Sequence, residues 1–399
     1  MNTSTRLLSL DIFRGLTIAF MILVNNPGDW ANVYSPLLHA DWHGCTPTDW
    51  VFPFFLFIVG VSIALAIAKR KSRGDDKSAI IKKILWRTLI IFAIGVFLNG
   101  FPYYEFPLRI AGVLPRIAIV YGITALIFLY ADWKRVIWVT VACLVAYWLM
   151  MAFIPVPIDE VMQQALDTGK VMTAHGLFDL KPLHQISDNF VAGNYQRGVN
   201  LEAYLDRHLL PGRLYQKTWD PEGLLSMIPS VGTCLLGVLT GLWIRRDMDV
   251  YKKLTGILGM GAILVAAGFV WSLTFPINKN LWTSSYVLYV SGVSLLFLGV
   301  IYWLVDVLGY KKGTKPFIVF GMNALIIYAL SGLIARLFGI IKWTTATGET
   351  ISLKGWLYNT FFTSFLSDIN ASFGWALFNV LLLLGIGWIL YWRKIFIKV

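Results

Sequence analysis

Long, uninterrupted apolar segments constrain this chain more than any other feature of its sequence. A helix needs roughly 20 apolar residues to cross a hydrocarbon core about 30 Å thick. Mean hydropathy is +0.66 and 57% of the 399 residues are hydrophobic, which excludes an ordinary water-soluble domain. The sequence therefore predicts an all-α, polytopic membrane protein with about ten transmembrane helices in a single domain, residues 1–399. The segments are 7–26, 49–68, 84–100, 112–130, 135–154, 224–243, 254–275, 282–305, 316–338 and 374–392.

Basic residues are concentrated in alternate connections between these segments. The connection 69–87 holds eight lysines and arginines, and the pattern continues after the fourth, sixth and eighth segments and in the tail. Because cytoplasmic loops carry an excess of such residues, we expect these connections and both termini to face the cytoplasm. The formal net charge of +12 then signals topology and contact with anionic membrane lipid, and we expect no nucleic-acid partner.

The other set of loops is expected on the outer face, and it contains all five histidines. These loops are 27–48, 101–111, 155–223, 276–281 and 339–373. Residues 155–223 form the long outer-face loop region. Their aromatic and acidic content (Tyr195, Tyr204, Tyr215, Trp219, Asp206, Asp220 and Glu222) suits recognition of a polar molecule. An amphipathic cap lying on the bilayer explains the same content equally well.

Ionisable and amide residues at membrane depth are costly, so each one is a candidate functional residue. Asp11, Arg14 and Asn25 project from the first segment within roughly 60° of one another, with Arg14 and Asn25 about 16 Å apart along the helix. A local Asp11–Arg14 ion pair explains the first two residues without any function. The Arg116 side chain can extend to the membrane surface or bind a phosphate. The Asn323 amide can hydrogen-bond between helices or line a binding site.

Two short outer stretches combine reactive and amide side chains. His39 and His43 lie four residues apart in a proline-containing loop that is unsuited to a helical metal pair, and the three cysteines show no CxxC spacing, so no metal is expected. Neutral imidazole suits a general base or nucleophile near physiological pH. The short turn Asn278–Lys279–Asn280 either binds a ligand through these side chains or is an ordinary polar turn.

Six motifs in chain order resemble the heparan-alpha-glucosaminide N-acetyltransferase family of transmembrane acyltransferases. They are RLLSLDIFRGLTIAFMILVNN, LLHADWHGCTPTDWVFPFFLFIVG, GVLPRIAIVYG, WDPEGLLSMIPS, FPINKNLWTSSY and FGMNALIIY. The resemblance implies that acetyl passes from cytosolic acetyl-CoA to the amine of a terminal glucosamine across the membrane. His39 matches the family's proposed catalytic histidine, which acts as acetyl carrier or general base.

The resemblance also implies roles for other residues. We expect Asn25 and Asp49 beside His39 in the catalytic group. Residues expected to line the acetyl-CoA or acceptor cavity are Arg14, on the polar face of the first helix, and Arg116, Asn278, Lys279, Asn280 and Asn323. The animal enzymes' additional N-terminal portion has no counterpart here. That difference favours a bacterial inner-membrane protein, with a periplasmic outer side and glucosamine or a short glucosaminide as acceptor.

Two other classes of function remain open on sequence alone. A solute transporter could use Asp11, Arg14 and Arg116 to bind substrate or relay protons. A membrane scaffold could bind a partner through the outer loop, but it leaves the polar residues at 25–49 and 278–280 unexplained. The sequence leaves the oligomeric state open, with a homodimer among the alternatives.

Overall fold

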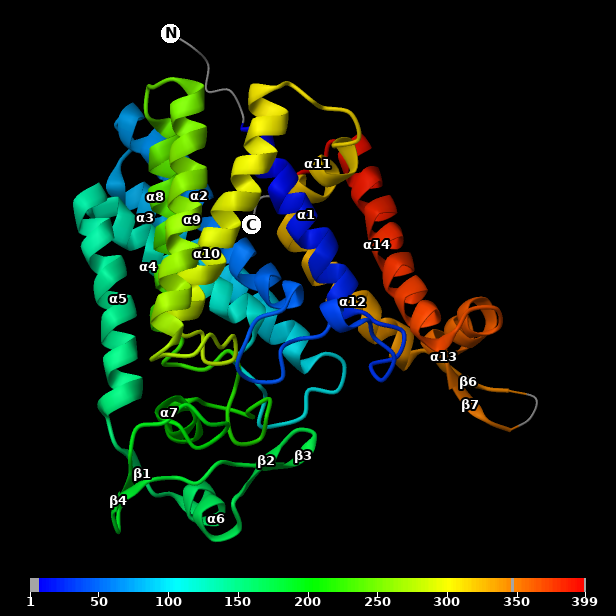
Figure 1. The fold of residues 1–399 in the computed structure, drawn as a ribbon. Helices are drawn as coiled ribbons and strands as arrows, with labels where there is room; N and C mark the ends of the chain where they lie inside the picture. Colours follow the sequence, from blue (N-terminus) through cyan, green and yellow to red (C-terminus); the bar gives the residue numbers. More distant parts are fainter. Residues whose placement is uncertain (1–6, 346–347, 398–399) are drawn as a thin grey trace.

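A bundle of long helices with a small cap at one end makes up the protein (Figure 1). The computed structural model describes residues 7–345 and 348–397. The helices of the bundle and its edge are α1 (Leu8–Asn25), α2 (Pro47–Arg73), α3 (Lys77–Gly100), α4 (Val113–Tyr130), α5 (Trp133–Phe153), α8 (Met227–Arg245), α9 (Val250–Ser272), α10 (Ser284–Tyr302), α11 (Lys315–Met322), α12 (Ala324–Ile340), α13 (Leu353–Tyr358) and α14 (Asp368–Trp392). The predicted all-α, polytopic class is confirmed.

The number of membrane-crossing helices differs from the predicted ten. Within the described residues, eight helices are long and apolar enough to cross a membrane. The pair α11 and α12, bent by 84° at Asn323, makes nine if it forms one span. The predicted segment 84–100 lies in α3, whose first half carries Lys77, Lys82 and Lys83 and is therefore less apolar. The count of ten is not confirmed.

The connections separate into two sets at opposite ends of the bundle. The connections α2–α3, α4–α5 and α8–α9, which are rich in basic residues, lie at the same end as the start of α1 (Figure 1). The loop after α1, the segment between α5 and α8 and the turn before α10 lie at the other end. Residues 1–6 and 398–399 are outside the described residues, so the predicted cytoplasmic placement of the chain ends stays a prediction.

The segment 155–223 folds as a cap on the bundle. It contains β1 (Val156–Pro157), α6 (Glu160–Thr168), β2 (Lys170–Thr173), β3 (Gly176–Asp179), β4 (Gln185–Ser187), β5 (Phe190–Val191) and α7 (Leu201–Leu209). The strands form a sheet of order β1-β5-β4 and the hairpin β2-β3, while β6 (Lys342–Thr344) and β7 (Thr350–Ser352) form a hairpin elsewhere. One hydrophobic cluster joins Trp219 and Val191 of the cap to Tyr147 of α5 and Phe275.

Helices α2 and α8 approach closely because glycines face each other where they pack. A Cβ atom on Gly60 would lie 1.9 Å from the carbonyl oxygen of Cys234, and one on Gly237 would lie 2.1 Å from that of Phe57. Small residues at such positions let the backbones of membrane helices come together. This contact fixes α2, whose first turn carries Asp49.

We predict that Gly60→Ala destabilises the protein by about 1–3 kcal/mol, because the added methyl group overlaps backbone atoms that cannot move independently. Thermal unfolding of the purified protein in detergent measures the change. Gly259→Ala on α9 is the matched control, since no atom lies within 4 Å of its added Cβ. Equal melting temperatures for the two variants would contradict the close approach of α2 and α8.

Candidate functional site

His39 and Asp49 form the central pair of the site. Thr46, Pro47 and Asp49 begin α2 with a capping box, in which the Asp49 carboxylate reaches back to the Thr46 backbone N–H at 2.9 Å. Its other oxygen, Oδ1, lies 2.7 Å from His39 Nδ1. The Asp49 side chain is 1% exposed and that of His39 is 44% exposed. A helix-capping carboxylate therefore holds an imidazole at the end of the bundle that carries the cap (Figure 1).

The partners of His39 determine its protonation. The Asp49 carboxylate accepts the proton of Nδ1, so the lone pair lies on Nε2. Burial and the nearby Lys279 ammonium lower the pKa of His39 below its ordinary value and outweigh the opposing effect of Asp49. His39 is therefore neutral at physiological pH, with a basic nitrogen available to a substrate.

Lys279 lies against the His39 ring in the turn between α9 and α10. Its Nζ is 3.1 Å from Nδ1 and 3.2 Å from Nε2, and 3.8 Å from Asp49 Oδ1. An ammonium equidistant from both ring nitrogens lies over the ring, not in line with a lone pair. The ammonium therefore lies within hydrogen-bonding distance of both ring nitrogens, Nε2 included.

Asn278 shapes the turn that carries Lys279. Its side-chain oxygen accepts the Leu281 N–H at 3.0 Å, and its own N–H donates to Thr283 Oγ1 at 3.0 Å. Its amide nitrogen lies 3.3 Å from His43 Nδ1. His43 thus contacts the turn and not the Asp49 carboxylate, while Asn280 follows Lys279 as a partly exposed residue.

Cys45 is the other conventional nucleophile near His39. Burial and the Asp49 carboxylate raise the pKa of its thiol, so it stays protonated. A thiol is a poor nucleophile compared with a thiolate. The neutral imidazole is therefore the better-activated group at this site.

Arg116 is fully buried at the outer end of α4. Its Nη2 donates to Ser226 Oγ at 2.5 Å and to the Gly223 carbonyl at 3.2 Å, and its guanidinium lies 5.2 Å from the ring centre of Trp282. The side chain connects α4 to the start of α8. It does not open onto the His39 surface.

Glu202 on α7 lies within the same buried polar region. Tyr147 Oη is 2.5 Å from the Leu281 carbonyl oxygen and 3.0 Å from Glu202 Oε2. The Tyr147 hydroxyl donates towards both the Leu281 carbonyl and the Glu202 carboxyl oxygen, so two acceptors share its one proton. Burial and the Asp206 carboxylate raise the pKa of Glu202 well above its ordinary value. Glu202 is thus an un-ionised acid that ties the cap to the Lys279 turn.

Asn25, at the last turn of α1, lines a separate cavity of about 400 Å³ between α1, α3, α4 and α12. Arg109 also lines it and forms ion pairs with Asp220 and Glu222, each at 2.7 Å. The Glu222 carboxylate acts electrostatically on His39 and on Tyr328, a lining residue of the cavity. Within the described residues Asn25 makes no contact with His39, so the structure does not bring these two predicted site residues together.

Arg14 and Asn323 lie apart from this region. Arg14 and Asp11 form an ion pair at 3.4 Å, which accounts for a charged residue at both positions without a ligand. Arg14 Nη2 also donates to Ser62 Oγ on α2 at 2.7 Å. Asn323 occupies the break between α11 and α12, where its amide exchanges hydrogen bonds of 3.0 and 2.9 Å with the backbones of Ile395 and Ile397. Both residues join helices or chain segments, and their predicted ligand-binding roles stay predictions.

Several residues of this region were not singled out as site residues by the sequence. Arg109 and Glu202 fall in loops whose contacts depend on the fold, so no local pattern marks them. Arg336 is different, because it lies within the predicted span 316–338 and the rule for charges at membrane depth applies to it. Applying that rule to every span would have identified it.

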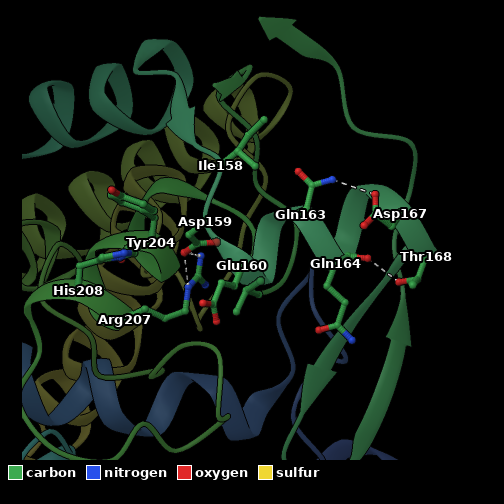
Figure 2. A pocket seen from close by; sticks show the side chains of 11 residues that line it. Ile158, Asp159, Glu160, Gln163, Gln164, Asp167, Thr168, Tyr204, Arg207 and His208 are labelled. Carbon is green, nitrogen blue, oxygen red and sulfur yellow. Dashed lines mark hydrogen bonds and ion pairs between the residues drawn. The ribbon is translucent and has the colours of Figure 1, made fainter. Parts of the chain in front are cut away.

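A larger groove lies on the cap between α6 and α7. Figure 2 shows its lining, with Asp159 paired to Arg207 at 2.8 Å and Gln163 bonded to Asp167 at 2.9 Å. Its volume is about 980 Å³. His208 is its histidine. The ring lies 2.8 Å from the Tyr204 backbone oxygen and against the Tyr204 ring, with centroids 4.2 Å apart, and no carboxylate among the described residues orients it. We place the candidate site at His39, because there the imidazole has both an orienting carboxylate and an adjacent cation.

Fold and site together define a polytopic helical membrane protein with a carboxylate-oriented histidine at one end of its bundle. The family model described as heparan-alpha-glucosaminide N-acetyltransferase, catalytic, matches residues 6–268. The chain belongs to this family. The match includes the helices from α1 to most of α9, the cap and His39.

Two relatives extend the similarity beyond residue 268. Heparan-alpha-glucosaminide N-acetyltransferase of Mus musculus is 29% identical over 435 residues, covering 100% of this chain and 61% of the relative. The Homo sapiens protein of the same name is 31% identical over 365 residues, covering 81% of this chain and 52% of the relative. The chain therefore spans less than two thirds of the length of either relative.

We predict that Lys279→Gln raises the pKa of His39, because it removes the cation that disfavours the imidazolium. The wild-type imidazole should stay neutral to a lower pH than the variant imidazole. Histidine NMR titration, with the His39 signal assigned by its loss in His39→Gln, measures this shift. Lys181→Gln is the control. The Lys181 ammonium lowers the pKa of His43, so its removal should leave the pKa of His39 unchanged. An unchanged His39 pKa in Lys279→Gln would contradict the electrostatic contact.

Proposed function

We propose that this protein is a transmembrane acetyltransferase that moves acetyl from cytosolic acetyl-CoA to the amine of a glucosamine-type amino sugar on the outer side. The observation that carries the proposal is the neutral His39, held by Asp49 beneath the Lys279 ammonium, in a chain of this family. The basic connections at the opposite end of the bundle support a cytoplasmic donor side. The outer side is then periplasmic, in a bacterial inner membrane.

The arrangement supports acyl transfer in either of two forms. As a general base, His39 Nε2 takes a proton from the amine while the C–N bond forms and the thioester C–S bond breaks, and the thiolate leaves. As a carrier, Nε2 first attacks the thioester carbonyl, the C–S bond breaks and the CoA thiolate leaves. The amine then attacks the acetyl carbonyl, the bond from Nε2 to the acetyl carbon breaks, and the released Nε2 takes the amine proton. In both forms Asp49 stabilises the imidazolium, and the adjacent Lys279 ammonium stabilises negative charge on the carbonyl oxygen or sulfur.

Asn25 contributes an amide from the separate cavity in this proposal. Because Lys279 lies against the imidazole, we assign it to the reacting centre and not to the CoA phosphates. A phosphate-binding role for Arg116 stays a prediction, and its burial under Trp282 does not favour it. Contact with lipid and assembly as a homodimer also remain predictions.

We predict that His39→Ala lowers the rate of acetyl transfer at least about 100-fold, because the reaction loses its base or carrier. His43→Ala, which removes a contact to Asn278 only, should lose much less. The assay supplies acetyl-CoA and glucosamine to purified protein and measures N-acetylglucosamine. Thermal melting checks that both variants fold. Equal losses at the two positions, with metal bound to the wild type, would favour a metal site instead.

We predict that acetylation proceeds across a membrane. In sealed vesicles of known orientation, acetyl-CoA on the side of the 69–87 connection should drive acetylation of glucosamine supplied only on the His39 side. Detergent-opened vesicles give the control rate, and vesicles with His39→Ala give the background. Acetylation that requires both substrates on one side would refute transfer across the membrane. It would still support the proposed acetyltransferase activity.

A solute transporter is the second candidate, and the break between α11 and α12 favours it. Transporters bind substrates where membrane helices are interrupted, and the 84° bend at Asn323 is such an interruption. Uptake of radiolabelled glucosamine without acetyl-CoA, and without formation of N-acetylglucosamine, distinguishes this function from the proposed one.

A further inference from the structure

The cavity beside Asn25 is lined by a partly exposed arginine, Arg336, that forms no ion pair within the described residues. Its polar lining comes from Asn25 at the end of α1, Asn26 directly after it, Asn99 of α3, Arg109, and Tyr328, Ser331 and Arg336 of α12. Polar groups gathered around a space of about 400 Å³ between membrane helices are costly unless a ligand or water meets them.

The two arginines of the cavity differ in their partners. Arg109 makes a forked contact with Asp220, at 2.8 and 2.7 Å, and a further bond of 2.7 Å to Glu222. Arg336 donates from Nη1 to the Gly332 carbonyl of its own helix at 3.0 Å, and the described part of the chain offers it no ion pair. Its remaining N–H groups can therefore bind a ligand.

A structural reason for Arg336 must be weighed against a ligand. Arg336 lies one turn before the end of α12, where a cation interacts favourably with the helix dipole and can extend towards the membrane surface. Neither the interaction with the helix dipole nor the extension to the membrane surface requires a polar cavity with asparagine side chains beside Arg336. Asn25 lines the same cavity with an exposed side chain, so its amide is accessible to a ligand that enters from solvent. An arginine fork and an amide together suit an oxyanion.

We propose that this cavity binds an anionic group through Arg336, with Asn25 as a second donor. The ligand chemistry is that of a phosphate or carboxylate, and it has two sources. One is the phosphates of CoA, and the other is a carboxylate next to the amino sugar in the acceptor, as in a uronic acid. The choice between these sources rests on the proposed function, and the binding of an anion does not.

Binding measurements without turnover test the site. Isothermal titration of the purified protein with CoA, phosphate-free pantetheine, sodium glucuronate and glucosamine compares charged ligands with neutral or cationic ones. Arg336→Gln should weaken binding of one anionic ligand by at least about tenfold and leave the matching ligand without the anion unchanged. Arg213→Gln is the control, since it removes the same charge from an exposed ion pair with Glu105.

The outcomes separate the two sources. Loss of CoA affinity with unchanged pantetheine affinity assigns the cavity to the donor, and loss of glucuronate affinity alone assigns it to the acceptor. Unchanged affinity for both anions in a folded Arg336→Gln protein would overturn the proposal. These results stand whether or not the protein acetylates glucosamine, so the two proposals can fail separately.

A measurement on the wild type covers the case in which Arg336→Gln does not fold. Phenylglyoxal modifies accessible arginines, and mass spectrometry reports the modified fraction of Arg336 and Arg213. CoA or glucuronate should protect Arg336 and leave Arg213 modified. Equal modification of Arg336 with and without both ligands would overturn the proposal.

Discussion

The Asp49 carboxylate is the interaction on which the candidate site depends. One oxygen caps the first turn of α2 through the Thr46 backbone, and the other orients His39. A capping carboxylate is stabilised by the free N–H groups of the helix start and by the helix dipole, so it remains an ionised acceptor although it is 1% exposed. The packing that fixes α2 against α8 therefore also fixes the imidazole.

Apolar length and periodicity make the class of fold predictable from sequence, because a membrane span is a local property of about 20 residues. The start of α2 is also predictable from sequence, because Thr46-Pro47-Thr48-Asp49 is a capping sequence with proline at the first helical position. The span predicted from apolar length alone begins two residues later, at Asp49. The bend at Asn323 was not predictable, because the backbone that satisfies its amide lies 72 and 74 residues away.

Predictions of site residues succeeded where residues are close in sequence and were limited where contacts are long-range. His39 and Asp49 are ten residues apart, and one helix start brings them together. Lys279 reaches the ring from 240 residues away, so no spacing rule could connect it to His39 without the family resemblance. The partners of Arg116 and Arg109 lie in the cap and the turn that follows it. Only the folded chain shows which acidic residues neutralise which arginine.

The hydrogen bonds from Glu202 through Tyr147 to Leu281 have a consequence for motion. Proteins open in cooperative units, whose members are joined by buried contacts that break together. Helix α7, the outer end of α5 and the Lys279 turn share such contacts within one hydrophobic cluster. Displacement of the cap would therefore also loosen the turn that holds the ammonium over His39. Movement of the cap and the electrostatic environment of the imidazole are then coupled through these contacts.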